Sequence, residues 1–167
     1  MNQFVAQPQK IAKNGEIAPD FMLQNTEGED WRLSKYRGKV IALLFYPKDE
    51  TLVCTKQLCS LRDHWSEYQA TGAEIIGISD GTIEEHTRFA KHHNLPLPLL
   101  ADKGNWVTKA YSHHWLPTRL TLAIVVIDAN GIVLSRKVMF RAFRPNDDEV
   151  IAAILYAKTE LLKKELT

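Results

Sequence analysis

Two nearly unbroken apolar runs of strand length, each followed by an amphipathic segment, constrain the fold of this chain most strongly. The runs are residues 39–46 (KVIALLFY), which stop at Pro47, and residues 73–79 (AEIIGIS). Such runs are typical of strands that are covered on both faces of a sheet. Residues 55–71 and 82–94 repeat apolar side chains at steps of three and four, as one face of a helix does. The pattern predicts the order strand, helix, strand, helix.

The second half of the chain predicts a hairpin and a last helix. A short helix at 106–111 precedes two strands at 120–128 and 132–140, which the Asn130-Gly131 turn joins in antiparallel fashion. Residues 147–164 form a helical pattern. Its expected apolar side consists of Val150, Ile151, Ile154, Leu155, Leu161 and Leu162.

The N-terminal part predicts a small hairpin at the edge of the molecule. Extended candidates at 21–24 and 29–33 flank the Glu27-Gly28 turn. Together with the alternating unit, they indicate an α/β fold with a mixed central β-sheet flanked by helices and an N-terminal β-hairpin extension. We expect a single domain over 1–167, in which 1–14 are a loosely ordered extension.

Composition excludes some partners. The chain has 21 Lys and Arg against 20 Asp and Glu, a formal net charge of +1, so we expect no nucleic acid partner. The first ten residues lack the features of a secretion signal, and no apolar run is long enough to span a bilayer. The expected location is cytoplasmic, without a membrane partner.

The two cysteines, Cys54 and Cys59, need a chemical explanation, because a structural disulfide is uncommon in a reducing compartment. Cys54 falls near the start of the first predicted helix, where the amide groups and the helix dipole favour a thiolate. Cys54, Cys59 and His64 are spaced by five, and each step of five turns a helix by about 140°. These side chains therefore cannot converge on one ion, and we expect no metal site.

The segment around Cys54 resembles the peroxiredoxin family. Pro47, Thr51 and Cys54 match the family signature P-x-x-x-T-x-x-C. The stretch 45–63 (FYPKDETLVCTKQLCSLRD) is similar to the bacterioferritin-comigratory or peroxiredoxin Q branch, in which a second cysteine stands five places after the first. The resemblance extends from about Gly15 to the last helix. One departure is Leu52, where the family usually has proline.

The resemblance implies a thioredoxin-like fold and a thiol-dependent peroxidase for hydrogen peroxide and organic hydroperoxides. Cys54 would attack the peroxide and become a sulfenic acid, and Cys59 would then form a disulfide with it. The Arg119 guanidinium and the Thr51 hydroxyl would act as donors to the breaking oxygen–oxygen bond.

The resemblance also implies the surroundings of the reaction. Pro47 and Val53 would shape the substrate pocket, and no metal, haem or flavin cofactor is expected. The reductant would be thioredoxin, with glutaredoxin as an alternative. Members of this branch are often monomers, so a monomer is expected, with a dimer as the alternative.

Three other interpretations remain at this point. Cys59 could be idle in a one-cysteine peroxidase that an external thiol recycles. The chain could be a disulfide reductase or a redox-inert interaction module on the same scaffold, although the spacing is C-x-x-x-x-C and not C-x-x-C. The third interpretation is a chaperone-like holdase.

The spacing of the two cysteines also makes a structural prediction. If both cysteines lie on one regular helix, their Cα atoms are roughly 8 to 9 Å apart, beyond the roughly 7 Å limit for a disulfide. The resolving step would then need local unwinding.

Overall fold

The computed structural model describes residues 7–49, 52–114, 121–140 and 145–167, and only the backbone of 52–54. Within them one mixed sheet has the strand order β2-β1-β5-β4-β3-β6-β7. The strands are β1 (Met22–Asn25), β2 (Asp30–Arg32), β3 (Ile41–Phe45), β4 (Glu74–Ser79), β5 (Leu99–Ala101), β6 (Thr121–Ile127) and β7 (Val133–Phe140). The helices are the 3-10 turn η1 (Leu33–Tyr36) and α1 (Leu52–Asp63), α2 (Trp65–Ala70), α3 (Ile83–His92), α4 (Trp106–Tyr111) and α5 (Asp147–Glu165).

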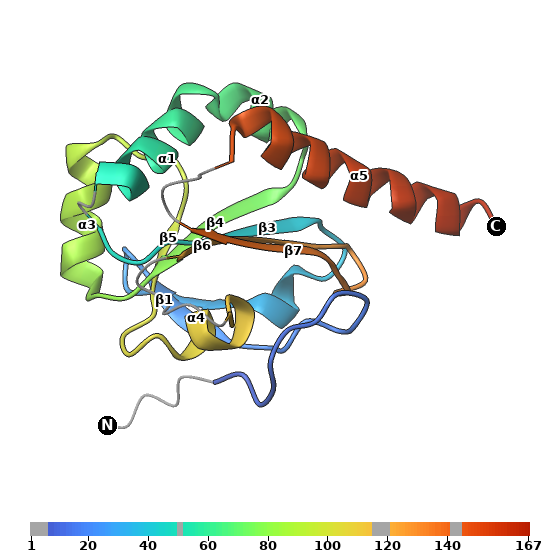
Figure 1. Cartoon of the computed structure of the whole chain (residues 1–167), viewed down its shortest axis with the longest axis horizontal. Helices are drawn as coiled ribbons and strands as arrows, with labels where there is room; N and C mark the ends of the chain where they lie inside the picture. The colour runs from blue at the N-terminus through green and yellow to red at the C-terminus, as the bar shows by residue number, and fades with distance from the viewer. Residues whose placement is uncertain (1–6, 50–51, 115–120, 141–144) are drawn as a thin grey trace.

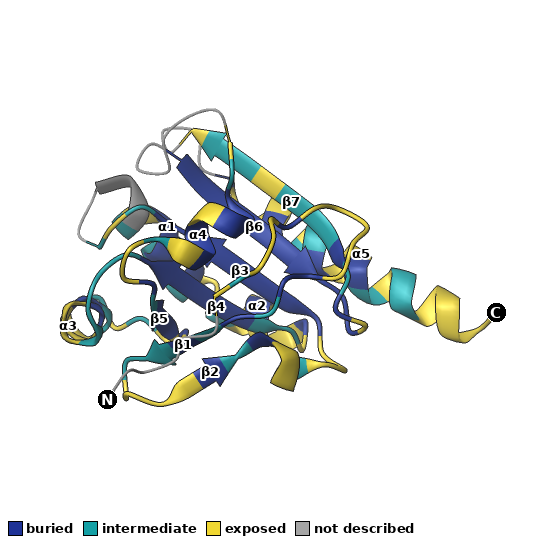
Figure 2. Cartoon of the chain, turned by 90° about the horizontal axis from the view of Figure 1, so that it is seen from below, coloured by how far each residue is buried: buried dark blue, intermediate teal, exposed yellow. Residues whose placement is uncertain are grey.

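Strand β3 lies in the middle of the sheet, as its apolar sequence predicts. It pairs in parallel with β4 and antiparallel with β6, so that Leu43 has Ile76 on one side and Val125 on the other. All five β3 residues are buried. Figure 2 shows the same burial along β3, β4 and β6. The predicted α/β fold with a mixed central sheet is thereby confirmed.

Alternate residues of β3 supply two hydrophobic cores, one on each face of the sheet. Ala42 and Leu44 belong to the core that α1, α2, α3 and α5 cover. Ile41, Leu43 and Phe45 belong to the other core, which is closed by α4 and the N-terminal segment. Figure 1 shows these two layers on opposite sides of the sheet.

The two predicted hairpins are present. Strands β1 and β2 pair antiparallel, and so do β6 and β7. In the second hairpin the Asp128 carboxylate accepts from the backbone N–H groups of Asn130 and Ile132. Gly131 adopts a φ of 81°, a left-handed conformation that glycine adopts without strain. The Asn-Gly signal in the sequence therefore has a local structural cause.

The predicted single helix over 55–71 is wrong in two respects: α1 begins earlier, at Leu52, and the helix breaks at His64. His64 has φ −106° and ψ 19°, and its backbone N–H is shared between the carbonyls of Ser60 and Leu61. Its ring Nδ1 also donates to the Ser60 carbonyl at 2.9 Å. This local hydrogen bonding competes with a regular helix and accounts for the break.

Strand β5 was not predicted from the sequence. It has only three residues, and Pro96 and Pro98 stand before it, so no alternating pattern marks it. The strand forms because it lies between β1 and β4 and pairs with both.

Both ends of the chain differ from expectation. Ala12, inside the segment expected to be loose, is fully buried and donates its N–H to Ala110, so ordered packing begins before residue 14. On α5, Val150 and Ile154 are buried as predicted, whereas Leu155 is 47% and Leu162 58% exposed. Leu155 lies between buried Ile154 and Ala157 and faces away from the core, whereas Leu162 lies in the second half of α5, which extends beyond the sheet (Figures 1 and 2).

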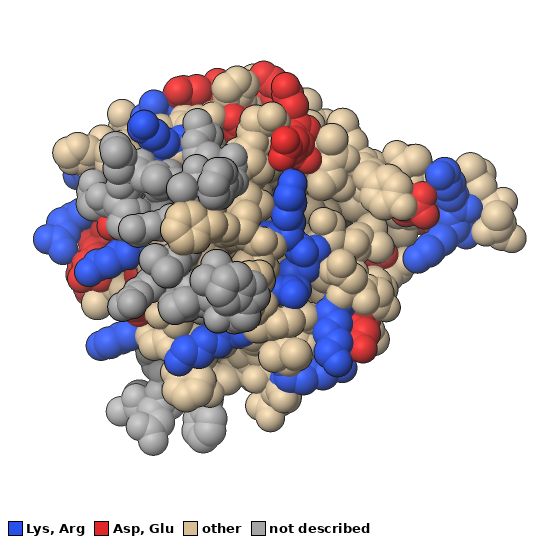
Figure 3. Space-filling view, viewed as in Figure 1, with Lys and Arg blue, Asp and Glu red and all other residues tan. Residues whose placement is uncertain are grey.

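Positively and negatively charged side chains both occur on the surface of the described part of the chain. On the face in Figure 3, described Lys and Arg side chains lie among Asp and Glu without forming one basic patch. None of the helices in the described ranges is long and apolar enough to cross a membrane.

Candidate active site

The backbone at Cys54 lies in the first turn of α1. Strand β3 ends at Phe45, and α1 begins at Leu52, which makes Cys54 the third helical residue. The first backbone N–H groups of a helix have no partner within it and carry the positive end of the dipole. A thiolate at this place would be electrostatically favoured.

The first turn of α1 contains no acidic residue. By contrast, α3 has Glu84 and Glu85 in its first turn, and α5 has Asp147, Asp148 and Glu149. Those carboxylates occupy the favourable position at the start of their own helices. Within the first turn of α1, Cys54 is the residue that can become an anion.

Several predicted site residues cannot be placed. Thr51 and Arg119 lie outside the described residues, and the side chains of Val53 and Cys54 are likewise not described. Pro47 is described and is half-buried. The convergence of these groups on one pocket therefore remains a prediction.

Cys59 is a partly buried free thiol on the same helix as Cys54. Helix α1 runs unbroken from Leu52 to Asp63, so it includes both positions. This agrees with the expectation that 54–59 is helical when no disulfide joins the two cysteines.

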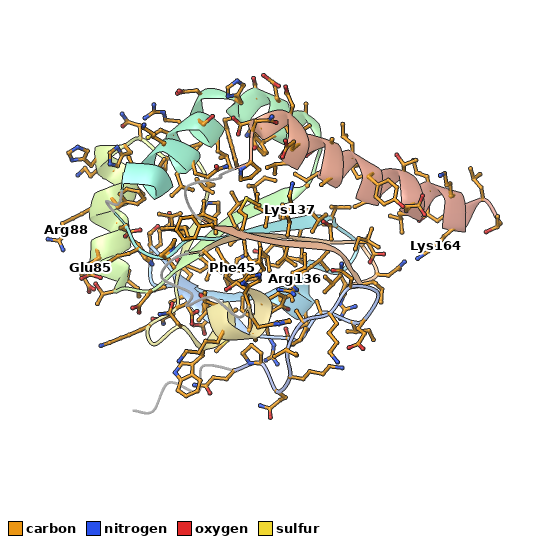
Figure 4. All side chains as sticks on the ribbon, viewed as in Figure 1. Phe45, Glu85, Arg88, Arg136, Lys137 and Lys164 are labelled. Carbon is orange, nitrogen blue, oxygen red and sulfur yellow. The ribbon has the colours of Figure 1, made fainter. Side chains whose placement is uncertain are left out.

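The sheet topology brings a second segment to the start of α1. Strands β3 and β6 are antiparallel, and Phe45, the last residue of β3, is opposite Ala123. The first residue of β6, Thr121, is therefore at the end of the sheet where β3 leads into α1. Phe45 lies in the centre of the molecule in Figure 4.

The structure adds a buried histidine–carboxylate pair that sequence analysis missed. His86, on α3, is fully buried, and its Nδ1 lies 2.5 Å from the Asp49 carboxylate. Asp49 belongs to the loop between β3 and α1. The signal was a histidine on the same helix face as Ile83 and Phe89, but nothing in the sequence names Asp49 as its partner.

The electrostatics of His86 follow from these neighbours. Burial alone would lower the pKa of His86, but its hydrogen bond to Asp49, the charge of Asp49, the bond to the Ser79 carbonyl and the charge of Glu85 raise it. The net direction of the pKa is upward. In Figure 4, Glu85 and Arg88 project outward from α3, whereas His86 is buried.

A second missed residue is Gln57, between the two cysteines on α1. Its side chain is only 4% exposed, and neither its amide nitrogen nor its oxygen has a hydrogen-bond partner among the described residues. It lines a small cavity together with apolar residues of β3 and β6, including Phe45 and Ala123. A buried amide without a partner among the described residues is an unusual feature, because most buried polar groups are paired.

Fold and site together define a thioredoxin-like protein with a cysteine at the start of a helix that follows a central strand. Residues 14–136 match the model of the AhpC/TSA family. That match covers more than half of the chain, and the chain belongs to the AhpC/TSA family.

Similar proteins agree with this assignment. A chloroplastic peroxiredoxin Q of Triticum aestivum is 43% identical over 129 residues, which are 74% of this chain and 58% of the wheat protein. The chain thus spans less than two thirds of that relative. A putative peroxiredoxin bcp of Coxiella burnetii is 34% identical over 147 residues, 88% of this chain and 89% of the relative.

A solved structure shows the same fold. The crystal structure of peroxidoxin BcpB from Mycobacterium tuberculosis has a TM-score of 0.72 and 28% identity, and the match covers 87% of this chain and 97% of that one. The similarity to the bacterioferritin-comigratory and peroxiredoxin Q branch, which the motif indicated, is confirmed.

Proposed function

We propose that this chain is a thiol-dependent peroxidase that reduces hydrogen peroxide and organic hydroperoxides through Cys54. The observation that carries the proposal is the position of Cys54 in the first turn of α1, directly after central strand β3 and without an acidic residue in that turn. Membership of the AhpC/TSA family and the peroxiredoxin relatives support the same chemistry.

The first step is an attack of the Cys54 thiolate on one peroxide oxygen. The oxygen–oxygen bond breaks, Cys54 becomes a sulfenic acid, and the leaving oxygen takes a proton and departs as water or an alcohol. Donors at the breaking bond would stabilise its developing negative charge. We assign this role to Thr51 and Arg119. Thr121, two residues after Arg119, begins β6 at the end of the sheet where β3 leads into α1, and this supports the assignment.

The second step joins the two cysteines. The Cys59 sulfur attacks the sulfenic sulfur, water leaves, and a disulfide forms. Because Cys54 and Cys59 lie on one continuous helix, the first turns of α1 must unwind for this bond. A thioredoxin dithiol, or alternatively glutaredoxin, then reduces the disulfide and is itself oxidised.

The remaining assignments concern the surroundings. Pro47 and Val53 shape the pocket through which the peroxide reaches Cys54. We propose that the protein acts as a monomer in the cytoplasm, where thioredoxin-type reductants keep thiols reduced.

Peroxide consumption by the full chain in the presence of a thioredoxin system tests the proposal. The wild-type protein should consume peroxide continuously, and Cys54→Ser should consume none, because it lacks the attacking thiolate. Full activity of the Cys54→Ser variant would refute the assignment.

A one-cysteine mechanism is the second candidate. The continuous helix over both cysteines supports it, because a regular helix keeps the two sulfur atoms apart. In that case an external thiol, and not Cys59, would react with the sulfenic acid. Mass spectrometry after one equivalent of peroxide separates the two mechanisms. An internal disulfide supports the first, and a trapped sulfenic acid or mixed disulfide supports the second.

A further inference from the structure

Both ring nitrogens of His86 lie within hydrogen-bond distance of an oxygen atom. His86 Nε2 lies 3.1 Å from the Ser79 carbonyl oxygen, which can only accept, so Nε2 carries a hydrogen. His86 Nδ1 lies 2.5 Å from Asp49 Oδ2, a second acceptor. An oxygen thus faces each ring nitrogen, and this arrangement stabilises the doubly protonated ring, in agreement with the upward shift of the His86 pKa.

The second carboxylate oxygen of Asp49 is also engaged. Asp49 Oδ1 accepts from the Tyr46 hydroxyl at 2.9 Å, and the Asp49 side chain is only 10% exposed. Tyr46 follows the last residue of β3 and is itself buried. Asp49 is therefore bound from two directions, by the end of β3 and by α3.

The chain encloses His86 on its other sides as well. Gly81 has a φ of 133°, and a Cβ at this position would lie 3.3 Å from His86 Cε1. The capping box between Thr82 and Glu85 fixes the start of α3 next to this turn. The imidazolium is thus held by β4, by the turn after it and by α3, and it presents Nδ1 to the loop.

The place of the pair in the chain connects it to the candidate thiol. Asp49 stands five residues before Cys54 and three before Leu52, where α1 begins. Because so few residues separate Asp49 from α1, a shift of the backbone at Asp49 would also shift the first turn of α1.

A purely structural explanation accounts poorly for the charges. Burying two ions has a desolvation penalty, and a well-packed apolar pair is often as stable or more so. A charged pair does provide direction, because each oxygen and each nitrogen has one defined partner. Such direction is useful where a backbone segment must be held to a fraction of an ångström.

We propose that Asp49 and His86 are positioning residues, which fix the loop between β3 and α1 and so align Cys54 with the peroxide. This inference rests on the proposed peroxidase function. Neither residue touches the peroxide, and neither exchanges a proton with it. The pair therefore affects the reaction of Cys54 with peroxide, which needs aligned donors. It does not affect reactions that need only an ionised thiol.

The test uses a Cys59→Ser background, so that Cys54 is the only thiol. The variants are Asp49→Asn, His86→Gln and the double variant, with His92→Gln as the matched control, an exposed histidine at the end of the same helix. Two rate constants are measured for each variant. One is for oxidation of Cys54 by hydrogen peroxide, and the other is for alkylation by iodoacetamide at a pH where the thiol is ionised.

Each single variant should lower the peroxide rate constant by about ten- to a hundredfold, as a small misplacement of reacting groups does. The double variant should be no slower than the slower single variant, because the two residues act as one unit. Alkylation should stay within about twofold, since it needs only the thiolate. His92→Gln should leave both rate constants unchanged.

Parallel losses in both reactions would overturn the proposal, because they indicate a general disturbance of α1. Unchanged peroxide rate constants would also overturn it.

A second variant covers the case in which Asp49→Asn does not fold. Tyr46→Phe removes one donor to the same carboxylate and keeps the buried ring, and the proposal requires a selective loss of the peroxide rate constant in this variant too. Absence of any reaction between the parent protein and peroxide would refute the proposed function together with the pair, whereas an active parent with unaffected variants refutes the pair alone.

Discussion

Ser60, the residue directly after Cys59 on α1, donates its hydroxyl hydrogen to the Asp147 carboxylate at 2.5 Å. Asp147 is buried at the start of α5, and its other oxygen accepts the Tyr68 hydroxyl at 2.6 Å. Burial, followed by this bond to Asp147, raises the pKa of Tyr68. The cluster fastens α1, α2 and α5 together immediately behind Cys59. Unwinding that starts at the beginning of α1 would therefore end in front of this cluster.

Asp147→Asn should destabilise the protein by about 1–2 kcal/mol, because two charge-assisted hydrogen bonds become neutral ones. Asp148→Asn is the matched control, since Asp148 is exposed in the same helical turn. The free energy of unfolding should fall by less than about 1 kcal/mol in Asp148→Asn, which is the size of the helix-dipole effect. Urea unfolding at pH 7 gives both values, and equal losses would mean that the buried cluster contributes nothing beyond the dipole.

Gln57→Met should stabilise the reduced protein by about 1 kcal/mol, because it removes a buried amide without a described partner and keeps the length of the side chain. Gln69→Met, at an exposed position on α2, should change the free energy of unfolding by less than about 0.5 kcal/mol. A stabilised α1 should also unwind more rarely, so disulfide formation after peroxide addition should be slower in Gln57→Met. Destabilisation by this substitution would show that the amide has a partner.

The contribution of His86 to stability should decrease as the pH rises. Its pKa in the folded protein is raised above the ordinary value of 6.5, despite the opposing effect of burial, by Asp49, the Ser79 carbonyl and Glu85. A raised folded-state pKa stabilises fully below about pH 6.5, and this stabilisation is lost as the pH passes through the folded-state pKa. The difference in unfolding free energy between wild type and His86→Gln should shrink from about pH 6.5 upward. A difference that grows with pH would contradict the charged pair.

Adjacent residues of α5 should differ strongly in their effect on stability. Ile154 is fully buried, whereas Leu155 is 47% exposed. Ile154→Ala should cost about 2–5 kcal/mol, as for other large-to-small changes in a core. Leu155→Ala should cost less than about 1 kcal/mol, because it removes a partly exposed side chain. Denaturant midpoints measure both, and similar losses would indicate that the outer side of α5 is also packed.

Sequence patterns predicted the elements whose burial is regular. The apolar run around Leu43 identified the central strand, and Asn130-Gly131 identified the hairpin of β6 and β7. Short α4 was predicted with its observed bounds. In each case, periodicity or turn chemistry within a few residues determines the structure.

Contacts between distant residues were not predictable in this way. Strand β5 depends on pairing with its neighbours, and the break at His64 depends on a ring bond to Ser60. The partner of His86 is Asp49, 37 residues away, and no local pattern joins the two. On α5, apolar residues stand both on the outer face, as Leu155 does, and in the half that extends beyond the sheet, as Leu162 does, so the apolar pattern alone did not separate packed from exposed positions.

The ionisation of the Cys54 thiol is the property on which the proposed peroxidase reaction depends. In the Cys59→Ser variant, thiolate absorbance near 240 nm is followed as a function of pH, with Cys54→Ser as the blank. We expect the pKa of the Cys54 thiol to fall in the range of roughly 3.5 to 7.5 that is typical of thiols at helix starts. An ionisation near 8.5, the ordinary value for cysteine, would contradict it.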